Sequence, residues 1–337
     1  MPQHLLGIEK LTREQIYRFI ENARSFVEVS ERSLKKVPPL RGKTVINLFL
    51  EPSTRTRTSF EIAAKRLSAD TVNIGGSDSS VLKGETLLDT VQTLQAMSPD
   101  ILVMRHRESG APNLVARYLK NTSVVNAGDG LHEHPTQALL DCLTLVRHFK
   151  ERSDGIENLR VAIVGDVRHS RVARSNIWAH LKLGNHVTLV GPPTLVPPEY
   201  GDKALFGEGV SVEHDLRRGL QGADVVMCLR MQLERQTQHF VPNLEEYSKQ
   251  YCVTERLLDE LAPDCVVLHP GPANRGLEVS SGVLDSARSL FRQQVNHGVA
   301  IRMAVLFQLS AGAASESSAR DSEAETDEIN ISLGESS

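Results

Sequence analysis

Short apolar runs alternate along the chain with segments whose apolar residues recur every three or four positions. The run Thr44–Leu50 has the length of a strand, and the segment after it has Phe60 and Ala63 at helical spacing. Near the start, Thr12 and Gln15 have the spacing of a capping box, which predicts that a helix begins there. In the first half the pattern further predicts strands at 71–74, 101–104 and 124–125 and helices at 12–29, 87–97, 113–119 and 135–149.

The same alternation resumes after a polar stretch at residues 150–158, which has the composition of a junction between domains. Strands and helices in repeated succession favour a mostly parallel sheet with helices on both faces, and ligands bind such sheets at the carboxyl ends of the strands. We therefore expect an α/β fold of two doubly wound parallel-sheet domains, 1–149 and 150–283, joined by helices around an active-site cleft. The second half contributes strands at 161–164, 187–190, 225–229 and 266–268, and a last helix at 284–310 is expected to pack back on the first domain.

Charge is distributed unevenly along the 337 residues. The whole chain has a formal net charge of −4, yet residues 311–337 hold seven acidic residues against one arginine. The remainder is close to neutral, which argues against a nucleic-acid-binding protein held by bulk charge, although a local cluster can still bind a small anion. The end of the chain is rich in Ser, Glu and Ala and cannot bury enough apolar surface to fold, so we expect an acidic disordered tail at 311–337.

The sequence indicates neither a membrane protein nor a secreted one. No apolar run reaches the roughly 18 residues of a membrane span, and the first residues lack the basic and apolar regions of a secretory signal. The cysteines are scattered, without paired or metal-ligand spacing: Cys142, Cys228, Cys252 and Cys265. These features favour buried free thiols in a reducing cytoplasm.

The segment at residues 52–61 follows a predicted strand and opens a predicted helix. Each of the seven residues from Ser53 to Ser59 carries a hydroxyl or a guanidinium. The first turn of a helix offers unpaired N–H groups and the positive end of the helix dipole, which together attract anions, and arginine side chains match phosphate oxygens. A Ser or Thr N-cap beside solvent-exposed arginines would explain one or two such residues, but not seven consecutive ones. The sequence therefore predicts a phosphate site, and one that is not a Walker loop.

This segment resembles the S-T-R-T-R-x-S-F-E signature of the transcarbamoylase family, in particular its aspartate-using members, and the resemblance extends over about residues 5–310. Two further motifs in the family's order lie in the first half. Residues 104–106 (Met-Arg-His) close a predicted strand, and residues 134–137 (His-Pro-Thr-Gln) open a predicted helix. The resemblance implies that Arg105, His134 and Gln137 face a carbamoyl group. Donors preorganised in this way stabilise the oxyanion of a tetrahedral intermediate.

Residues 75–85 form a Gly- and Ser-rich connection that, taken alone, would be an ordinary flexible loop. It resembles the family's mobile loop, in which a serine and a lysine reach the phosphate. Lys83 matches the lysine and Ser79 the serine, with the neighbouring Ser80 as the alternative. In the family this loop completes the site of a neighbouring subunit, so the resemblance implies a homotrimer of catalytic chains with shared active sites.

Three motifs of the second half follow predicted strands and resemble the family's second substrate site. Residues 165–171 match its G-D-x-x-x-x-R motif, and a dinucleotide site is not supported there because G-x-G-x-x-G is missing. Residues 230–232 match R-x-Q, and residues 269–272 match H-P-x-P with Gly271 at the variable position. Two arginines that converge from different strand ends suit a dicarboxylate such as aspartate.

The resemblance implies transfer of the carbamoyl group from carbamoyl phosphate to the amine of L-aspartate, giving N-carbamoyl-L-aspartate and phosphate in pyrimidine biosynthesis. It assigns carbamoyl phosphate to the domain at 1–149 and aspartate to the domain at 150–283, and it implies no metal and no organic cofactor. The residues expected to be catalytic are Arg55, Thr56, Lys83, Arg105 and His134. Those expected to bind carbamoyl phosphate are Ser53, Thr54, Arg55, Thr56, Ser79, Lys83, Arg105, His134, Gln137, Pro270 and Gly271, and those expected to bind aspartate are Lys83, Arg171, Arg230 and Gln232.

Two other functions remain open from the sequence. An ornithine transcarbamoylase would share the phosphate motif, but that branch usually has a His-Cys-Leu-Pro segment where this chain has His-Pro-Gly-Pro at 269–272. A catalytically silent scaffold of a pyrimidine-pathway assembly would be expected to lose Arg55, Lys83 or His134, and this chain has all three. The sequence identifies no general base, and it leaves open whether a regulatory chain or a dihydroorotase binds the trimer. Neither nucleic acid nor a membrane is expected as a partner.

Overall fold

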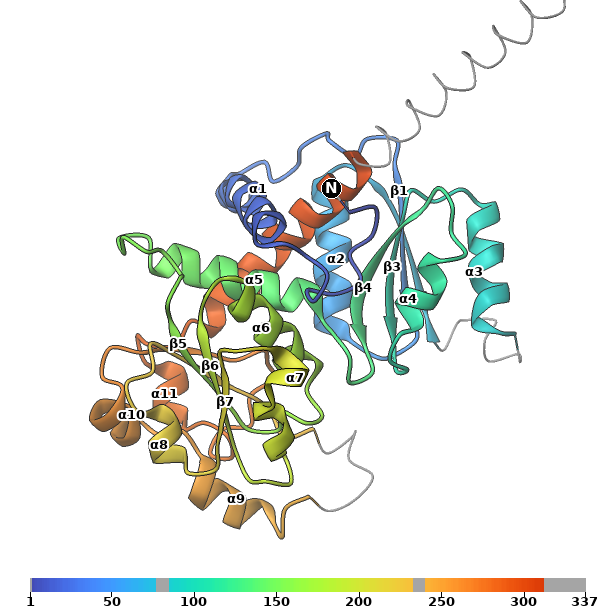
Figure 1. The fold of residues 1–337 in the computed structure, drawn as a ribbon. Coiled ribbons are helices and arrows are strands. Elements are labelled where there is room, and N and C mark those ends of the chain that lie inside the picture. The colour runs from blue at the N-terminus through green and yellow to red at the C-terminus, as the bar shows by residue number, and fades with distance from the viewer. Residues whose placement is uncertain (1, 77–84, 233–239, 312–337) are drawn as a thin grey trace, which may run out of the picture.

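The computed structural model describes residues 2–76, 85–232 and 240–311, whose strands form two separate parallel sheets (Figure 1). The first sheet has the strand order β2-β1-β3-β4 and the second the order β7-β6-β5-β8-β9. The predicted α/β fold with two parallel-sheet halves is therefore confirmed. The strands are β1 (Thr44–Phe49), β2 (Asp70–Gly75), β3 (Ile101–His106), β4 (Ser123–Asp129), β5 (Arg160–Val164), β6 (His186–Val190), β7 (Val210–Glu213), β8 (Val225–Cys228) and β9 (Val266–Leu268).

Helices connect these strands, and several begin at the caps that the sequence provides. The predicted capping box is present at the first helix, where the Thr12 hydroxyl accepts the Gln15 N–H at 3.2 Å and the Gln15 side chain accepts the Thr12 N–H at 2.9 Å. In the described part of the chain, no helix is long and apolar enough to span a membrane. The helices are α1 (Arg13–Glu31), α2 (Thr54–Arg66), α3 (Leu87–Ala96), α4 (Ala111–Ala116), α5 (Pro135–His148), α6 (Arg171–Lys182), α7 (Lys203–Phe206), α8 (Leu216–Leu220), α9 (Leu244–Tyr251), α10 (Glu255–Leu261), α11 (Ser281–Asp285), the 3-10 turn η3 (Pro198–Gly201) and a further helix at 291–311.

Both faces of the first sheet are covered. Helices α3 and α4 pack on one face through residues such as Val91 and Val115, and α1, α2 and α5 cover the other face (Figure 1). The central strands β1 and β3 are consequently buried at nearly every position, as expected for strands covered on both sides.

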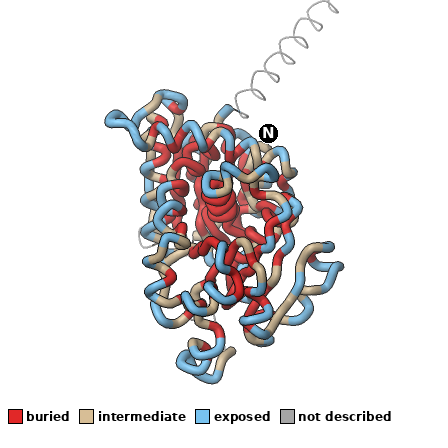
Figure 2. Tube along the Cα trace, turned by 90° about the vertical axis from the view of Figure 1, so that its left-hand side faces the viewer, coloured by how far each residue is buried: buried red, intermediate tan, exposed pale blue. Residues whose placement is uncertain are grey.

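A single apolar core continues from the first half into the second. On the second sheet, α8, α9 and α10 cover one face, while α6 lies on the other and joins the core that contains α1, α2 and α5. Figure 2 shows this buried interior as a band of red running through the centre of the molecule. The pair α5 and α6 therefore connects the two sheets by packing rather than by the chain alone.

The predicted helix at 284–310 is wrong in its first part. α11 ends at Asp285, and the Leu290 N–H donates instead to the Val267 carbonyl of β9 at 2.9 Å. This backbone pairing at the edge of the second sheet is incompatible with a continuous helix, because the same N–H cannot also bond within it. The helix at 291–311 then crosses to the first half, where Gln308 donates to the Arg18 carbonyl of α1 at 2.9 Å. The expected tail, from residue 312 onward, lies outside the described residues.

Replacing Leu306 with alanine should lower the free energy of unfolding by about 2–5 kcal/mol, the usual cost of a large-to-small change in a core. Leu306 is fully buried in the helix at 291–311, within the core shared by both halves. Chemical denaturation measures the change. Leu34→Ala is the matched control, since Leu34 is 73% exposed, and its effect should stay within about 0.5 kcal/mol. Equal effects of the two changes would contradict the packing described for this helix.

Candidate active site

A cavity of about 900 Å³ lies where the carboxyl ends of strands from both sheets face each other. In each sheet the strand order reverses beside a central strand, between β1 and β3 in the first and between β5 and β8 in the second. Ligand-binding crevices of parallel sheets form at such reversals. Ser79 and Lys83 lie outside the described residues. The other predicted site residues all line this cavity: Ser53, Thr54, Arg55, Thr56, Arg105, His134, Gln137, Arg171, Arg230, Gln232, Pro270 and Gly271.

The N-terminus of α2 forms one wall, directly after β1. Ser53 is the N-cap residue, yet among the described residues its side chain makes no capping hydrogen bond, so its hydroxyl is available to the cavity. Thr56 is buried in the first turn. Desolvation and then the positive charge of Arg230 lower the pKa of Arg55. The first turn of α2 therefore presents N–H groups, hydroxyls and a crowded guanidinium to the same space, which suits an anion.

Glu51 joins the two halves at the wall of the cavity. Its carboxylate accepts from the two terminal guanidinium nitrogens of Arg171 at 2.6 and 2.7 Å and from Arg105 at 3.1 Å. Arg105 ends β3 and Arg171 begins α6, so one acid from the first half bridges arginines of both. The guanidiniums pack against Gly128, where an added Cβ would lie 3.1 Å from nitrogens of both arginines.

His134 caps the start of α5 and is held from the second half. Its backbone N–H donates to the Ser175 hydroxyl of α6 at 2.8 Å, and that hydroxyl donates to Glu133 at 2.7 Å. The side chain is buried at the cavity wall. The packing of α5 on α6 thus sets the position of this imidazole.

Arg230 and Gln232 follow β8 and contact each other. The Arg230 guanidinium donates to the Gln232 side-chain oxygen at 3.3 Å, and the Gln232 N–H donates to Asp166 at 3.1 Å. Asp166 follows β5 and is fully buried. A buried acid therefore fixes the backbone of the pair while its side chains face the cavity.

The loop after β9 is shaped by one histidine. His269 Nδ1 accepts the Gly271 N–H at 2.8 Å, so the proton of a neutral ring lies on Nε2, which faces Glu278 at 3.2 Å. Gly271 has φ +66°, and a Cβ there would lie 2.6 Å from the Arg55 guanidinium. A larger residue would be strained and would displace Arg55, so glycine permits the two halves to approach at this point.

Sequence analysis missed several residues of the cavity. Glu51 directly precedes the predicted phosphate motif, but nothing in its local pattern indicates that it bridges two distant arginines. Gln294 and Arg302 belong to the helix at 291–311, which enters the cavity wall only through tertiary packing. The position of Glu51 next to the phosphate motif could have drawn attention to it, whereas Gln294 and Arg302 belong to no motif.

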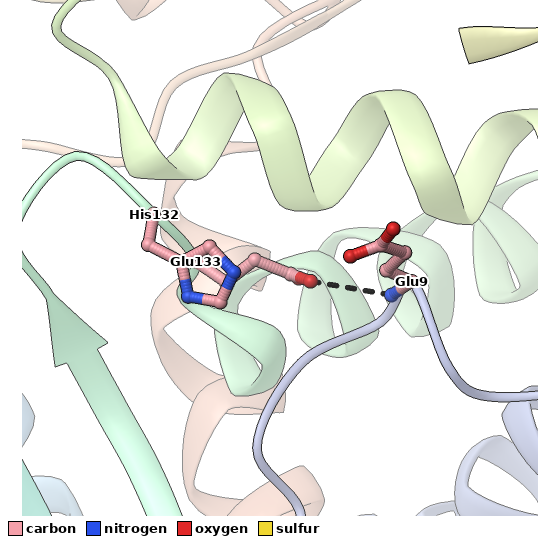
Figure 3. Close-up of side chains that lie close together, drawn as sticks. All are labelled: Glu9, His132 and Glu133. Atoms are coloured by element: carbon pink, nitrogen blue, oxygen red, sulfur yellow. Dashed lines mark hydrogen bonds between the residues drawn. The ribbon is translucent and has the colours of Figure 1, made fainter. Parts of the chain in front are cut away.

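A second group of polar residues has the composition of a metal site. Ligand atoms of Glu9, His132 and Glu133 lie within 4.8 Å of one another (Figure 3). Glu133, however, already accepts the Ile8 N–H at 2.7 Å, the Ser175 hydroxyl at 2.7 Å and the Glu9 N–H at 3.2 Å. Its carboxylate therefore anchors the N-terminal segment to α6, which explains the cluster without a metal.

Both halves of the chain match known proteins. Residues 3–147 match the family described as the aspartate/ornithine carbamoyltransferase carbamoyl-P binding domain, and residues 157–309 match the Asp/Orn binding domain. The aspartate carbamoyltransferase catalytic subunit of Magnetococcus marinus is 53% identical over 94% of this chain and 95% of its own length. The catalytic subunit of Syntrophotalea carbinolica is 54% identical over 94% of this chain and 98% of its own length.

Solved structures agree with these relatives. Aspartate transcarbamoylase from Trypanosoma cruzi in complex with carbamoyl phosphate and aspartate is 30% identical, with a TM-score of 0.79 over 90% of this chain and 95% of that one. The catalytic subunit of M. Jannaschii aspartate transcarbamoylase is also 30% identical, with a TM-score of 0.79 over 91% of this chain and 98% of that one. Sequence and structure thus agree along nearly the full length of the relatives, and the chain belongs to the aspartate/ornithine carbamoyltransferase family.

Proposed function

We propose that this chain transfers the carbamoyl group of carbamoyl phosphate to the amine of L-aspartate, giving N-carbamoyl-L-aspartate and phosphate, a step of pyrimidine biosynthesis. The charge of the cavity carries this proposal. Its described lining contains the carboxylate of Glu51 and five arginines: Arg55, Arg105, Arg171, Arg230 and Arg302. Such an excess of guanidinium groups suits two anionic substrates bound side by side.

The first half would bind carbamoyl phosphate. Ser53, Thr54, Arg55 and Thr56 at the start of α2 would hold the phosphate, because helix N–H groups, hydroxyls and a guanidinium converge there. Arg105, His134 and Gln137 line the adjoining wall and would face the carbamoyl group. Donors aimed at the carbonyl oxygen would stabilise the negative charge that develops on it in the tetrahedral intermediate.

The second half would hold aspartate against this group. Arg171, Arg230 and Gln232 would bind its two carboxylates, while the backbone carbonyls of Pro270 and Gly271 would accept from the amine and the carbamoyl group. The neutral amine attacks the carbonyl carbon, a C–N bond forms, and the C–O bond to phosphate breaks. The departing phosphate takes the amine proton, so no separate general base is needed. Most of the acceleration would come from positioning two mutually repelling anions.

Direct assay distinguishes aspartate from ornithine as the acceptor. Purified chain with carbamoyl phosphate should release phosphate and form N-carbamoyl-L-aspartate when aspartate is added. Ornithine should not be carbamoylated, because its side-chain cation would meet Arg171 and Arg230 rather than carboxylates. Turnover with ornithine alone would overturn the assignment of the acceptor.

Replacing Arg230 with alanine should raise the KM for aspartate and lower kcat, because a misoriented amine cannot attack. The loss of a charge-assisted bidentate contact should cost about 2–4 kcal/mol in kcat/KM, which is tens- to hundreds-fold. The KM for carbamoyl phosphate should change little. Arg275→Ala is the matched control, since Arg275 pairs with Asp285 on the surface of the same half at 2.8 Å. A wild-type KM for aspartate in Arg230→Ala would remove Arg230 from the site.

We further propose a homotrimer in which Ser79 and Lys83 of one chain complete the phosphate site of the next. The proposal rests on the resemblance of residues 75–85 to the family's mobile loop, and a heterologous interface of this kind closes as a ring. The scattered thiols, all of them free, support a cytoplasmic location.

Complementation tests the shared site. Lys83→Gln and Arg55→Ala should each be inactive, since each removes a phosphate-binding group from every site. If the sites are shared, hybrid trimers contain some sites with both defects and some with neither, so activity should reappear when the two proteins are dissociated, mixed and reassembled. A charged tag on one variant separates hybrid trimers by native gel electrophoresis. If such hybrids form but stay inactive, each site is built from one chain.

A further inference from the structure

A fully buried carboxylate, Asp141, lies one helical turn after Gln137 in α5. Its Oδ1 accepts side-chain N–H groups from Gln137 at 2.9 Å and from Gln294 at 2.7 Å, and its Oδ2 accepts from Asn176 at 3.0 Å. The four residues come from α5, α6 and the helix at 291–311, so three elements meet on one side chain. Asp141 itself is 0% exposed and is not among the residues that line the cavity.

Backbone groups fix the direction of the Gln294 and Asn176 amides, and Asp141 fixes that of Gln137. The His269 N–H donates to Gln294 Oε1 at 3.0 Å, so the other end of the Gln294 amide, its NH2, faces Asp141. Asn176 Nδ2 likewise also donates to the Val172 carbonyl at 3.0 Å. Because Asp141 Oδ1 is thereby an acceptor, Gln137 must also turn its NH2 toward it. The amide oxygen of Gln137 is left as the end that faces the cavity.

We propose that Asp141 is a positioning residue, which holds Gln137 with its amide oxygen toward the carbamoyl group so that the site recognises the carbamoyl NH2. This inference rests on the proposed function and deepens it. An acyl phosphate with a methyl group in place of the NH2, such as acetyl phosphate, has the same phosphate and carbonyl but cannot donate to that oxygen. The orientation of Gln137 therefore discriminates between the two classes of substrate.

The cost of burying Asp141 agrees with such a role. Burial raises the pKa of Asp141 to about 7, and the N–H donors of Gln294, Asn176 and Gln137 oppose that shift. Taking a carboxyl group out of water costs stability that an apolar side chain of similar volume does not. Unlike an apolar side chain, however, the carboxylate is a hydrogen-bond acceptor, so a neighbouring amide must turn its NH2 toward it.

Selectivity is measured as the ratio of the inhibition constant of acetyl phosphate to the KM for carbamoyl phosphate. Asp141→Leu and Asp141→Ala should each lower this ratio about tenfold, the value of one hydrogen bond to the substrate. Leucine fills the volume of the carboxylate but leaves three amides without an acceptor. Alanine leaves a polar space that water can enter, so it provides a second variant if the leucine protein does not fold. Water satisfies the Gln137 NH2 without fixing its direction.

Two further variants separate positioning from loss of stability. Asp141→Asn keeps an acceptor toward Gln137 and Gln294, but its new NH2 faces the NH2 of Asn176, whose direction the Val172 carbonyl fixes, so this variant should lower the melting temperature. This variant should keep the wild-type ratio within twofold. Asn176→Ala removes one donor of the network but not the acceptor of Gln137, so it should lower the melting temperature and leave the ratio unchanged.

Gln137→Ala completes the experiment. If Asp141 acts through Gln137, the ratio in Gln137→Ala should fall as in Asp141→Ala, and the double variant should fall no further. A wild-type ratio in both Asp141→Leu and Asp141→Ala, or full additivity in the double variant, would overturn the inference while the enzyme still carbamoylates aspartate. Failure of the wild-type chain to form N-carbamoyl-L-aspartate would instead overturn the proposed function.

Discussion

Crowding of like charges around one cavity is the constraint on which the rest of the site depends. Arginines from both halves line the same space, where burial and like charge disfavour a guanidinium cation. The consequences are visible in two of them: desolvation and Arg230 lower the pKa of Arg55, and burial lowers the pKa of Arg302 to about 10. Glu51 offsets part of this charge by binding Arg105 and Arg171 together. Bound anions would offset the remainder, so the folded protein is organised electrostatically for ligands that it must attract.

Such a site needs a rigid frame, because repelling groups stay together only where packing holds them. The frame is the core that continues through α5 and α6 from one sheet to the other. It holds His134 through Ser175, and Asp141 through Asn176. The helix at 291–311 returns from the second half to α1 and strengthens the same connection. The two halves therefore meet as a packed interior around the cavity, and residues of each position side chains of the other.

Local patterns predicted most of the fold and the anion-binding turn at residues 53–59, whereas the other site residues were expected from the resemblance to the family. Strands such as β1 and β3 are buried on both faces and therefore show as apolar runs. β7 was missed because it is a four-residue edge strand, Val210–Glu213, in which no position is fully buried. The break at 286–290 depends on pairing with β9, a distant segment. Glu51, Gln294 and Arg302 join the cavity through tertiary contacts, which no single-sequence pattern reports.

The network around Asp141 also joins the two substrate sites. The His269 N–H, in the loop proposed to meet aspartate, fixes Gln294, and Gln294 and Gln137 share one oxygen of Asp141. Because an ionised carboxylate can only accept, both amides turn their NH2 groups toward it, and both lose their anchor if it moves. His269 in turn is held by Glu278 and shapes Gly271, which lies against Arg55. The loop that would position the amine and the side chain that would recognise the carbamoyl group are therefore parts of one hydrogen-bonded unit, so a change in either should be felt at the other.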